Sequence, residues 1–194
     1  MRNQRSRRAA DLGDLRGCGV ALASGLILAT FAHAAAQVPS RSPDVAFASA
    51  PPAIVDAMLD LARVTSDDVV YDLGCGDGRI VIAAAKNRGA RGVGIDIDPA
   101  RIADATALAL REGMTARVTF VLGDLFEAQF ADATVVMLYL QPEPNLRLRQ
   151  RLLTELRPGT RVVSLSYDMG DWTPDAVRRI GGRRIYLWTI PARP

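Results

Sequence analysis

The sequence predicts an α/β fold in which helices cover both faces of a mostly parallel sheet. From residue 51 onward, apolar β-branched runs that suit buried strands alternate with segments of helical apolar spacing. A glycine-rich turn joins the first of these strands to the helix that follows it. Near the C-terminus, two further β runs flank Gly181-Gly182, which is typical of a hairpin. Alternating strands and helices form parallel sheets, and the hairpin adds an antiparallel strand.

The first strand and its glycine turn organise the rest of the chain. Residues 69–73 are an apolar run suited to a strand buried on both faces, and residues 80–86 have helical spacing. The intervening glycines are Gly74, Gly76 and Gly78. Glycine permits positive φ, and it leaves room for a ligand that a Cβ would obstruct. Such a strand–turn–helix unit holds nucleotide-like ligands at the carboxyl edge of a sheet, although it can also be purely structural.

The charges around this turn discriminate between nucleotide-like ligands. A dinucleotide loop reads G-x-G-x-x-G, whereas this turn reads G-x-G-x-G and has Arg79 at the third glycine position. Asp72 precedes the turn and Asp77 lies at the start of the helix, where both would repel a pyrophosphate. A ligand with an ammonium, a sulfonium and no phosphate fits better, which describes S-adenosylmethionine. The predicted ligand-binding residues of this stretch are Asp72, Gly74, Gly76, Asp77 and Gly78.

Length and charge limit the classes of function. The chain has 194 residues, enough for one domain with a proper core. Its formal net charge is +3, but residues 1–36 contain five arginines and two aspartates, which leaves 19 basic and 19 acidic residues in the remainder. A neutral body exerts no overall attraction on nucleic acid, so there is no strong nucleic-acid signal.

Histidine and cysteine counts exclude several chemistries. The only histidine is His33, and one of the two cysteines is Cys18, so the region beyond residue 36 keeps Cys75 alone. No histidine there can activate Cys75 as a nucleophile, and we expect it to be a small packing residue beneath the ligand. An internal disulfide and zinc sites built on cysteine and histidine are excluded for the same reason.

Residues 1–36 have the pattern of a signal peptide or membrane anchor. A basic start precedes an apolar run, and Ala32-His-Ala34 has the small-x-small form of a leader-peptidase site. The apolar core is short for a membrane span, which favours a secretory signal. We therefore expect export to the periplasm or membrane association through the N-terminus. Because S-adenosylmethionine is made in the cytosol, the alternatives are an anchor with cytosolic access, a real export pathway, or a misassigned start codon and a cytosolic protein.

Residues 37–50 are rich in proline, serine and alanine and are expected to link this segment to one domain, residues 51–194. Pro51-Pro52 then begins a helix, because proline suits the first helical turn. The apolar face of this helix is expected to cover the sheet and one side of the ligand cleft.

A second buried strand begins at Gly92 and ends at Asp96, twenty residues beyond Gly76. A carboxylate in that position can accept both hydroxyls of a ribose, so Asp96 is a predicted ligand residue. Asp98 is followed by proline, which is typical of a helix start, and we assign it mainly to capping.

Three further strands are predicted along the rest of the chain, at residues 117–122, 133–140 and 160–166. Asp124 follows the first of them, where a ligand contact and a simple turn aspartate are equal alternatives, and the two preceding motifs favour the ligand. Asn145 is expected to cap the helix after the second. The outer face of that helix is expected to be solvated, with a membrane surface or an acidic partner as the alternative. Its arginines are Arg147, Arg149, Arg151 and Arg157.

Residues 167–172 follow the last of these strands at its ligand-side end. They contain two aromatic side chains and two carboxylates, which could attract and desolvate a cationic side chain. The equal alternative is a structural loop around a buried Trp172.

The stretch from Asp72 to Gly78 resembles the first motif of class I S-adenosylmethionine-dependent methyltransferases. Together with residues 94–98, 123–124, 138–140 and 186–188, it is similar to one small group of these enzymes. The group contains the archaeal broad-specificity protein lysine methyltransferase and the mitochondrial enzyme that methylates a lysine of the ATP synthase c-ring protein. The resemblance implies a minimal Rossmann-like domain with a seven-stranded, mostly parallel sheet and a C-terminal antiparallel hairpin.

The resemblance also implies a cofactor and further site residues. S-adenosyl-L-methionine is the implied methyl donor, and no metal is implied. Asp124 matches the acidic residue that accepts the adenine amino group, and Leu125 or Phe126 would wall the ring. Tyr139, at the carboxyl end of the fourth strand, is the candidate catalytic residue. It would orient an acceptor amine, unless it points away from the cleft and serves packing.

The implied acceptor is a protein lysine amine, whose ordinary pKa of about 10.4 must fall in a desolvating cleft before attack. Residues 139–142 do not match the Asn/Asp-Pro-Pro-Tyr/Phe motif of enzymes that methylate base amines and glutamine amides. The alternatives are a small-molecule or RNA methyltransferase and a non-catalytic domain that binds the donor. The oligomeric state has no signal in the sequence.

Overall fold

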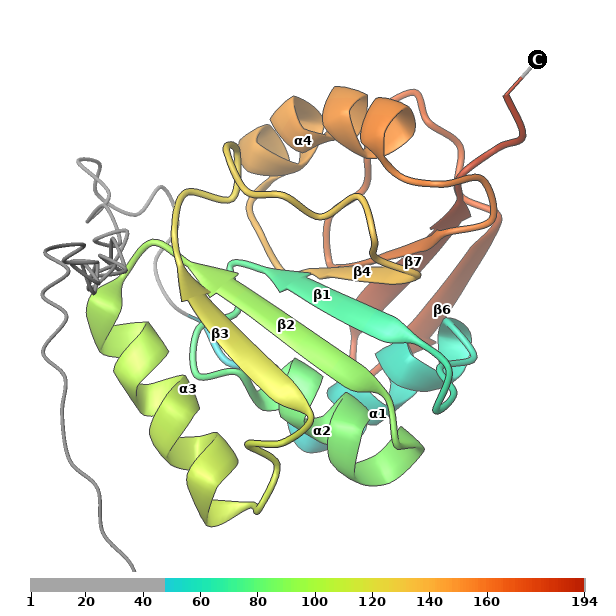
Figure 1. Ribbon diagram of the computed structural model, residues 1–194. Coiled ribbons are helices and arrows are strands. Elements are labelled where there is room, and N and C mark those ends of the chain that lie inside the picture. The colour runs from blue at the N-terminus through green and yellow to red at the C-terminus, as the bar shows by residue number, and fades with distance from the viewer. Residues whose placement is uncertain (1–47, 194) are drawn as a thin grey trace, which may run out of the picture. The chain divides into compact units, whose positions relative to one another are not determined.

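The computed structural model describes residues 48–193, which form one seven-stranded sheet flanked by helices (Figure 1). The strands are β1 (Val69–Leu73), β2 (Arg91–Asp96), β3 (Val118–Leu122), β4 (Val135–Leu138), β5 (Arg161–Leu165), β6 (Ala176–Ile180) and β7 (Arg183–Thr189). Their order is β3-β2-β1-β4-β5-β7-β6. Neighbours among β1 to β5 are parallel, and β7 is antiparallel to both β5 and β6. The predicted sheet and closing hairpin are confirmed.

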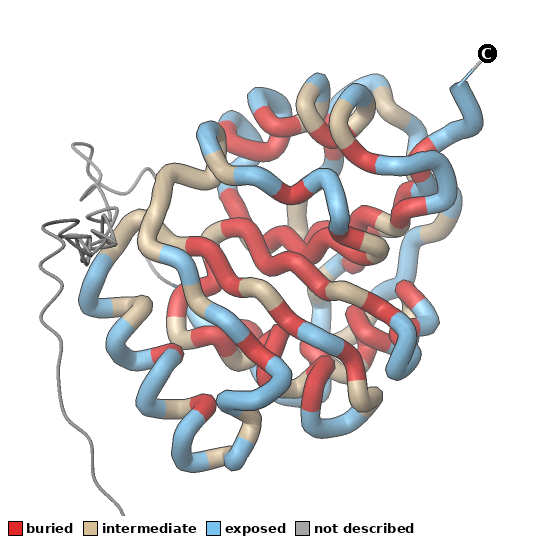
Figure 2. Tube along the Cα trace, viewed as in Figure 1, coloured by how far each residue is buried: buried red, intermediate tan, exposed pale blue. Residues whose placement is uncertain are grey.

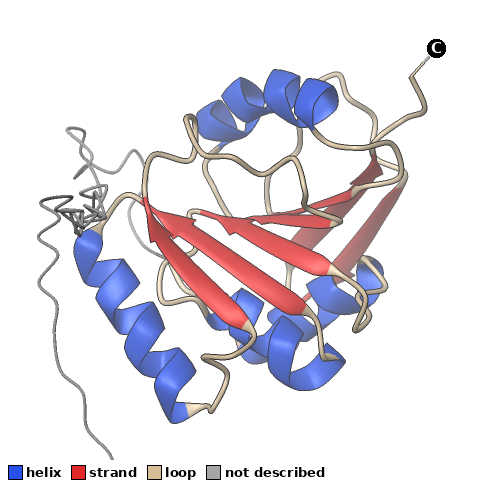
Figure 3. Ribbon diagram, viewed as in Figure 1, coloured by secondary structure: helices blue, strands red, loops and turns tan. Residues whose placement is uncertain are grey.

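The helices form a layer on each face of the sheet. They are α1 (Pro52–Leu61), α2 (Arg79–Arg88), α3 (Pro99–Arg111) and α4 (Pro142–Glu155). The first three cover one face and α4 covers the other (Figure 3). The predicted start of α3 is confirmed, because Asp98 Oδ1 accepts a hydrogen bond of 2.8 Å from the main-chain nitrogen of Ala100.

The start of α4 differs from the prediction. Pro142 occupies its first turn, and the N-cap is Gln141, which makes no side-chain capping bond. Asn145, the predicted cap, is buried within the helix, and its Nδ2 donates to Ser164 Oγ at 3.1 Å and to the Tyr167 carbonyl at 3.4 Å. The prediction is wrong because a proline suited to the first turn lies three residues before the asparagine.

Two arginines of α4 hold loops in place, although the sequence predicted a solvated face. Arg151 donates to the carbonyl of Phe126 at 2.6 Å, in the loop after β3. Arg149 donates to the carbonyl of Met169 at 2.9 Å and forms an ion pair with Asp171, both in the loop after β5. The helix therefore fixes two loops that follow parallel strands.

Figure 2 shows that buried residues follow the central strands, and two clusters of buried side chains pack against the sheet. One cluster, which includes Met58 and Leu59, joins α1 and α2 to the sheet. The other includes Leu148, Leu152 and Trp188 and lies beneath α4. A sheet packed on both faces gives the loops at its edge a rigid support.

The strand order reverses beside β1, which pairs in parallel with β2 on one side and with β4 on the other. In open α/β sheets, ligands bind outside the carboxyl ends of the strands at such a switch point. The glycine turn that follows β1 lies there.

The predicted signal peptide or anchor, residues 1–36, lies outside the described residues, as does most of the predicted linker, residues 37–50. Between residues 48 and 193, no helix has the length and apolar character needed to cross a bilayer.

Candidate active site

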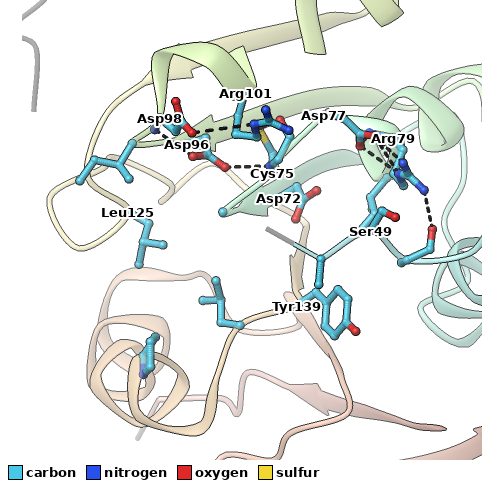
Figure 4. Close-up of a pocket in the computed structure, with 18 of the residues that line it drawn as sticks. Ser49, Asp72, Cys75, Asp77, Arg79, Asp96, Asp98, Arg101, Leu125 and Tyr139 are labelled. Atoms are coloured by element: carbon cyan, nitrogen blue, oxygen red, sulfur yellow. Dashed lines mark hydrogen bonds and ion pairs between the residues drawn. The ribbon is translucent and has the colours of Figure 1, made fainter. Parts of the chain in front are cut away.

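A pocket of about 450 Å³ opens at the carboxyl ends of β1, β2 and β4 (Figure 4). The predicted site residues that line it are Asp72, Gly74, Gly76, Asp77, Asp96, Asp124, Leu125 and Tyr139. Gly78, and Phe126 as the alternative to Leu125, are not among the lining residues. Side chains chosen from four separate sequence segments therefore face one cavity.

Glycines shape the turn after β1 for two different reasons. Gly74 has a φ of 85°, and a Cβ there would lie 2.7 Å from Leu140 Cδ2 in the wall of the pocket. Gly78 has a φ of 74° and precedes α2, and a Cβ there would lie 2.5 Å from Phe120 Cε1. Close packing against β3 is sufficient to explain the glycine at position 78. A contact between Gly78 and the ligand stays a prediction.

Asp96, at the end of β2, is held by two main-chain donors. Gly76 N donates to its Oδ2 at 2.8 Å, and Asp98 N donates to its Oδ1 at 3.0 Å. Each carboxylate oxygen keeps a further lone pair for another donor, and Asp96 lines the pocket. Each anchored oxygen can accept from one ribose hydroxyl, and that contact stays a prediction.

Asp72 presents a buried carboxylate to the same pocket. The residue is 2% exposed, and no residue between 48 and 193 gives its carboxylate a hydrogen bond or ion pair. Burial, followed by the nearby charges of Asp96 and Asp77, raises the pKa of Asp72 to about 8. An isolated buried acid is costly unless a cation accompanies it. A cationic group bound in the pocket would therefore favour the ionised form of Asp72.

Asp77, by contrast, already has a cationic partner. Arg79 Nε donates to its Oδ1 at 2.9 Å, and Nη2 donates to its Oδ2 at 2.5 Å. Burial opposes ionisation of Asp77, but these bonds and the charge of Arg79 lower its pKa below the usual value. Arg79 Nη1 also donates to the Ala50 carbonyl at 3.0 Å. This arginine thus ties the segment before α1 to the glycine turn.

Asp124 and Leu125 reach the pocket from the loop after β3. Asp124 Oδ1 accepts a 2.8 Å hydrogen bond from Phe126 N, so it forms a turn as well as lining the cavity. Phe126 does not line the pocket, and the Arg147 guanidinium lies 3.7 Å above its ring. Of the two residues predicted as a wall for an adenine ring, Leu125 is the one placed for it.

Tyr139 lies just beyond β4 and lines the pocket, with its ring partly buried against the core on the α1 side. Arg183, the first residue of β7, donates from Nη1 to its hydroxyl oxygen at 2.5 Å. The hydroxyl keeps a second lone pair and its own proton. Tyr139 therefore lines the cleft while its ring also packs against the core, and the role of its hydroxyl in positioning an amine stays a prediction.

Sequence reasoning missed the three residues just before α1. Ala48, Ser49 and Ala50 line the pocket, although they fall within the predicted linker. The residues of α1 itself do not line it, contrary to expectation. The sequence signal for this contact was Arg79, which occupies a turn position where dinucleotide loops have glycine. Its side chain donates a hydrogen bond to the Ala50 carbonyl.

The loop at residues 167–172 has a structural role. Trp172 packs against Trp188 with ring centroids 5.6 Å apart, and Trp188 Nε1 donates to the Trp172 carbonyl at 2.7 Å. None of the residues of this loop lines the pocket. Of the two interpretations of the loop, the structure supports the one built on a packed Trp172.

Cys75 lies in the pocket floor and is 5% exposed. Burial, followed by the charges of Asp72 and Asp96, raises the pKa of its thiol well above the usual range. A thiol that stays protonated is a poor nucleophile, which agrees with the predicted packing role.

Several known proteins are similar to this chain. The family model described as the ANTKMT methyltransferase domain matches residues 72–176. The protein-lysine N-methyltransferase of Saccharolobus islandicus (strain REY15A) is 40% identical over 156 residues, which cover 78% of this chain and 97% of that protein. The ATP synthase C-subunit lysine N-methyltransferase of Homo sapiens is 32% identical over 158 residues, which cover 80% of this chain and 67% of that protein.

A solved structure of an RNA methyltransferase from Salinibacter ruber is also similar. It is 51% identical, with a TM-score of 0.75, and the match covers 76% of this chain and 96% of that chain. That protein was crystallised with S-adenosyl-L-homocysteine, which is the methyl donor without its methyl group.

The residues that line the pocket fit S-adenosyl-L-methionine independently of these similarities. The unpartnered carboxylate of Asp72 suits the ammonium, the anchored oxygens of Asp96 suit the ribose hydroxyls, and Leu125 offers an apolar wall. When bound, the donor supplies a methyl group already activated by its sulfonium. The predicted family, cofactor and activity are confirmed. The chain belongs to the family of the ANTKMT methyltransferase domain and is an S-adenosylmethionine-dependent methyltransferase.

Proposed function

We propose that this protein methylates the side-chain amine of lysine in a protein acceptor. The observation that carries the proposal is the position of Tyr139, which lines the donor pocket beyond β4 with its hydroxyl held by Arg183. A hydroxyl in that position can orient an amine that enters from the open side of the pocket. The names of the archaeal and human relatives support lysine as the acceptor.

A lysine must lose its proton before it attacks, and the site offers two means to favour that loss. The guanidinium of Arg183 opposes a second cation beside Tyr139 and so lowers the pKa of an incoming ammonium. Desolvation in the cleft acts in the same direction. Because the only histidine of the chain is His33, the proton would pass to water, with Tyr139 holding the amine in position.

RNA is the second candidate acceptor, because the Salinibacter ruber relative is described as an RNA methyltransferase. The overall charge of the domain does not favour it. Basic and acidic residues are balanced at 19 each beyond residue 36, so the domain has no net attraction for a polyanion.

A labelled-donor screen tests the proposal. The full-length protein is incubated with methyl-labelled S-adenosylmethionine and with protein, RNA or metabolite fractions of membrane and soluble extracts. We expect label in protein, and acid hydrolysis should recover it as methyl-lysine. Label confined to RNA or to small molecules would contradict the proposal, and donor binding without transfer to any fraction would indicate a non-catalytic role.

Export or membrane attachment through residues 1–36 stays a prediction. The test is the mass of the mature protein recovered from the producing cell. Cleavage after Ala34 would support a secretory signal, and an intact N-terminus in the soluble cytosolic fraction would contradict both the signal and the anchor.

A further inference from the structure

The β6–β7 hairpin ends beside the acceptor side of the pocket. β7 runs antiparallel to β5 and pairs Ile185 with Leu165, so its first residues lie at the sheet edge where the parallel strands end. The same edge carries the donor pocket. Arg183 reaches from this hairpin to the hydroxyl of Tyr139. Arg183 shares a face of β7 with Ile185, whereas Arg184 lies on the opposite face with Tyr186, so the hairpin tip presents charge on both faces at this edge of the sheet.

The hairpin concentrates positive charge at this end. Its arginines are Arg178, Arg179, Arg183 and Arg184. No acidic residue occurs between residues 176 and 193. Within the described part of the chain, none of the four forms an ion pair with a carboxylate, whereas arginines elsewhere do so, as Arg149 does with Asp171. Arg183 is engaged by Tyr139, whereas the exposed Arg178, Arg179 and Arg184 are available to an external anion.

The strand register brings two of these charges together. Arg179 lies directly opposite Arg184 on the neighbouring strand. Like charges in directly opposed positions destabilise a sheet, so fold stability does not explain the pair. Charge on an edge strand also prevents aggregation, but that reason applies to β6 alone. Arg183 and Arg184 lie on β7, which is paired on both sides.

We infer that the β6–β7 hairpin binds acidic residues that flank the acceptor lysine. This inference rests on the proposed lysine methylation. Guanidinium groups bind carboxylates through paired, charge-assisted hydrogen bonds. Carboxylates on either side of a lysine would neutralise the hairpin charges and hold the lysine next to Tyr139. The enzyme would then prefer lysines in acidic sequence.

An acidic peptide fits this surface better than RNA. Proteins that bind single-stranded RNA combine basic side chains with aromatic side chains on which the bases stack. Residues 176–185 contain four arginines and no aromatic residue. The surface therefore offers charge pairing without a stacking platform.

The test compares two peptides that share one lysine and differ only in their flanks, glutamate or glutamine. With the full-length protein and labelled donor at low salt, we expect kcat/KM to be at least tenfold higher for the glutamate peptide. The advantage should shrink as salt is added, because exposed charges are screened. In the double variant Arg179→Gln/Arg184→Gln the ratio should approach one, while the Kd of S-adenosylmethionine, which reports an intact pocket, stays as in the wild type.

The control is Arg91→Gln/Arg111→Gln, which removes the same charge from exposed residues at the start of β2 and the end of α3. This variant should keep the glutamate preference. Equal rates on both peptides in the wild type, or equal loss of preference in the two double variants, would overturn the inference. Methylation of neither peptide, with label entering a short RNA, would contradict the proposed lysine function itself.

Discussion

Arg183 Nη1 donates a hydrogen bond of 2.5 Å to the hydroxyl oxygen of Tyr139, a residue 44 positions away in the chain. The guanidinium carbon lies 5.8 Å from the centroid of the tyrosine ring. One partner follows β4 and the other begins β7, so the C-terminal hairpin positions a side chain of the donor pocket. The candidate catalytic residue is therefore held by the last strand along the chain.

Replacing Tyr139 by phenylalanine removes the hydroxyl and keeps the ring. We expect kcat on a lysine peptide to fall by about 10- to 100-fold, because the amine loses its positioning contact. The Kd of the donor should stay unchanged. Tyr167→Phe is the matched control, since it removes the same atom from a residue that does not line the pocket. Unchanged turnover in Tyr139→Phe would remove the proposed role.

Replacing Arg183 by glutamine tests whether the guanidinium acts through Tyr139. Without the positive charge, the pKa of a bound lysine should rise toward its ordinary value. The pH–rate profile should therefore move to higher pH, in addition to a lower kcat. A purely structural role predicts a loss of stability with no shift of the profile. Arg183→Lys keeps the charge and should retain the wild-type pH dependence.

Donor binding should release a proton, because of Asp72. Its pKa is raised to about 8, so the group is protonated at pH 6.5. The donor ammonium favours the carboxylate and lowers that pKa, so binding expels about one proton, and affinity rises between pH 6 and 7.5. Calorimetry in buffers of different ionisation enthalpy measures the number of protons. If Asp72→Asn released the same number of protons on donor binding, Asp72 would not be the group that loses the proton.

Asp96→Asn should raise the Kd of the methyl donor by about 10- to 100-fold, because each hydrogen bond to a charged group contributes about 1.5–3 kcal/mol to binding. Asparagine has one acceptor oxygen, so it can keep only one of the two main-chain contacts, from Gly76 or from Asp98, and a loosened turn contributes to the loss of affinity. Asp67→Asn provides the control, as this exposed residue lies before β1, away from the pocket. Isothermal titration calorimetry measures the Kd of the methyl donor for both variants. An Asp96 variant with wild-type affinity would exclude the ribose contact.

Gly78→Ala should destabilise the fold much more than Gly113→Ala. Both residues have positive φ, 74° and 69°, so both variants carry a backbone strain of about 1–2 kcal/mol. A Cβ at position 113 has no atom within 4 Å, whereas one at position 78 overlaps the Phe120 ring. The overlap should cost about 1–3 kcal/mol more in free energy of unfolding. Equal urea midpoints for the two variants would contradict the packing role.

Local pattern was sufficient to predict the strands and the sheet edge at which the candidate ligand residues meet. Asp72 lies within the first apolar run, Asp96 ends the second and Asp124 follows the third, and parallel strands bring such positions together at one edge. The antiparallel hairpin could also be predicted from the sequence, because Gly181-Gly182 separates two β runs.

Contacts between distant segments could not be predicted from the sequence. The unpartnered state of Asp72, the bond from Arg79 to Ala50 and the bond from Arg183 to Tyr139 depend on how the loops fold back over the sheet. The error at Asn145 has a local cause, since a proline three residues earlier already starts the helix. In the helix interior, that asparagine instead bonds across to Ser164.

The most direct test of the site is a crystal structure of the full-length protein with S-adenosyl-L-homocysteine and a lysine peptide. We predict ribose hydroxyls on Asp96, the ligand ammonium beside Asp72, and the lysine amine within hydrogen-bond distance of the Tyr139 hydroxyl. A nucleoside placed away from Asp96, or a peptide that enters on a side remote from Tyr139, would contradict this arrangement.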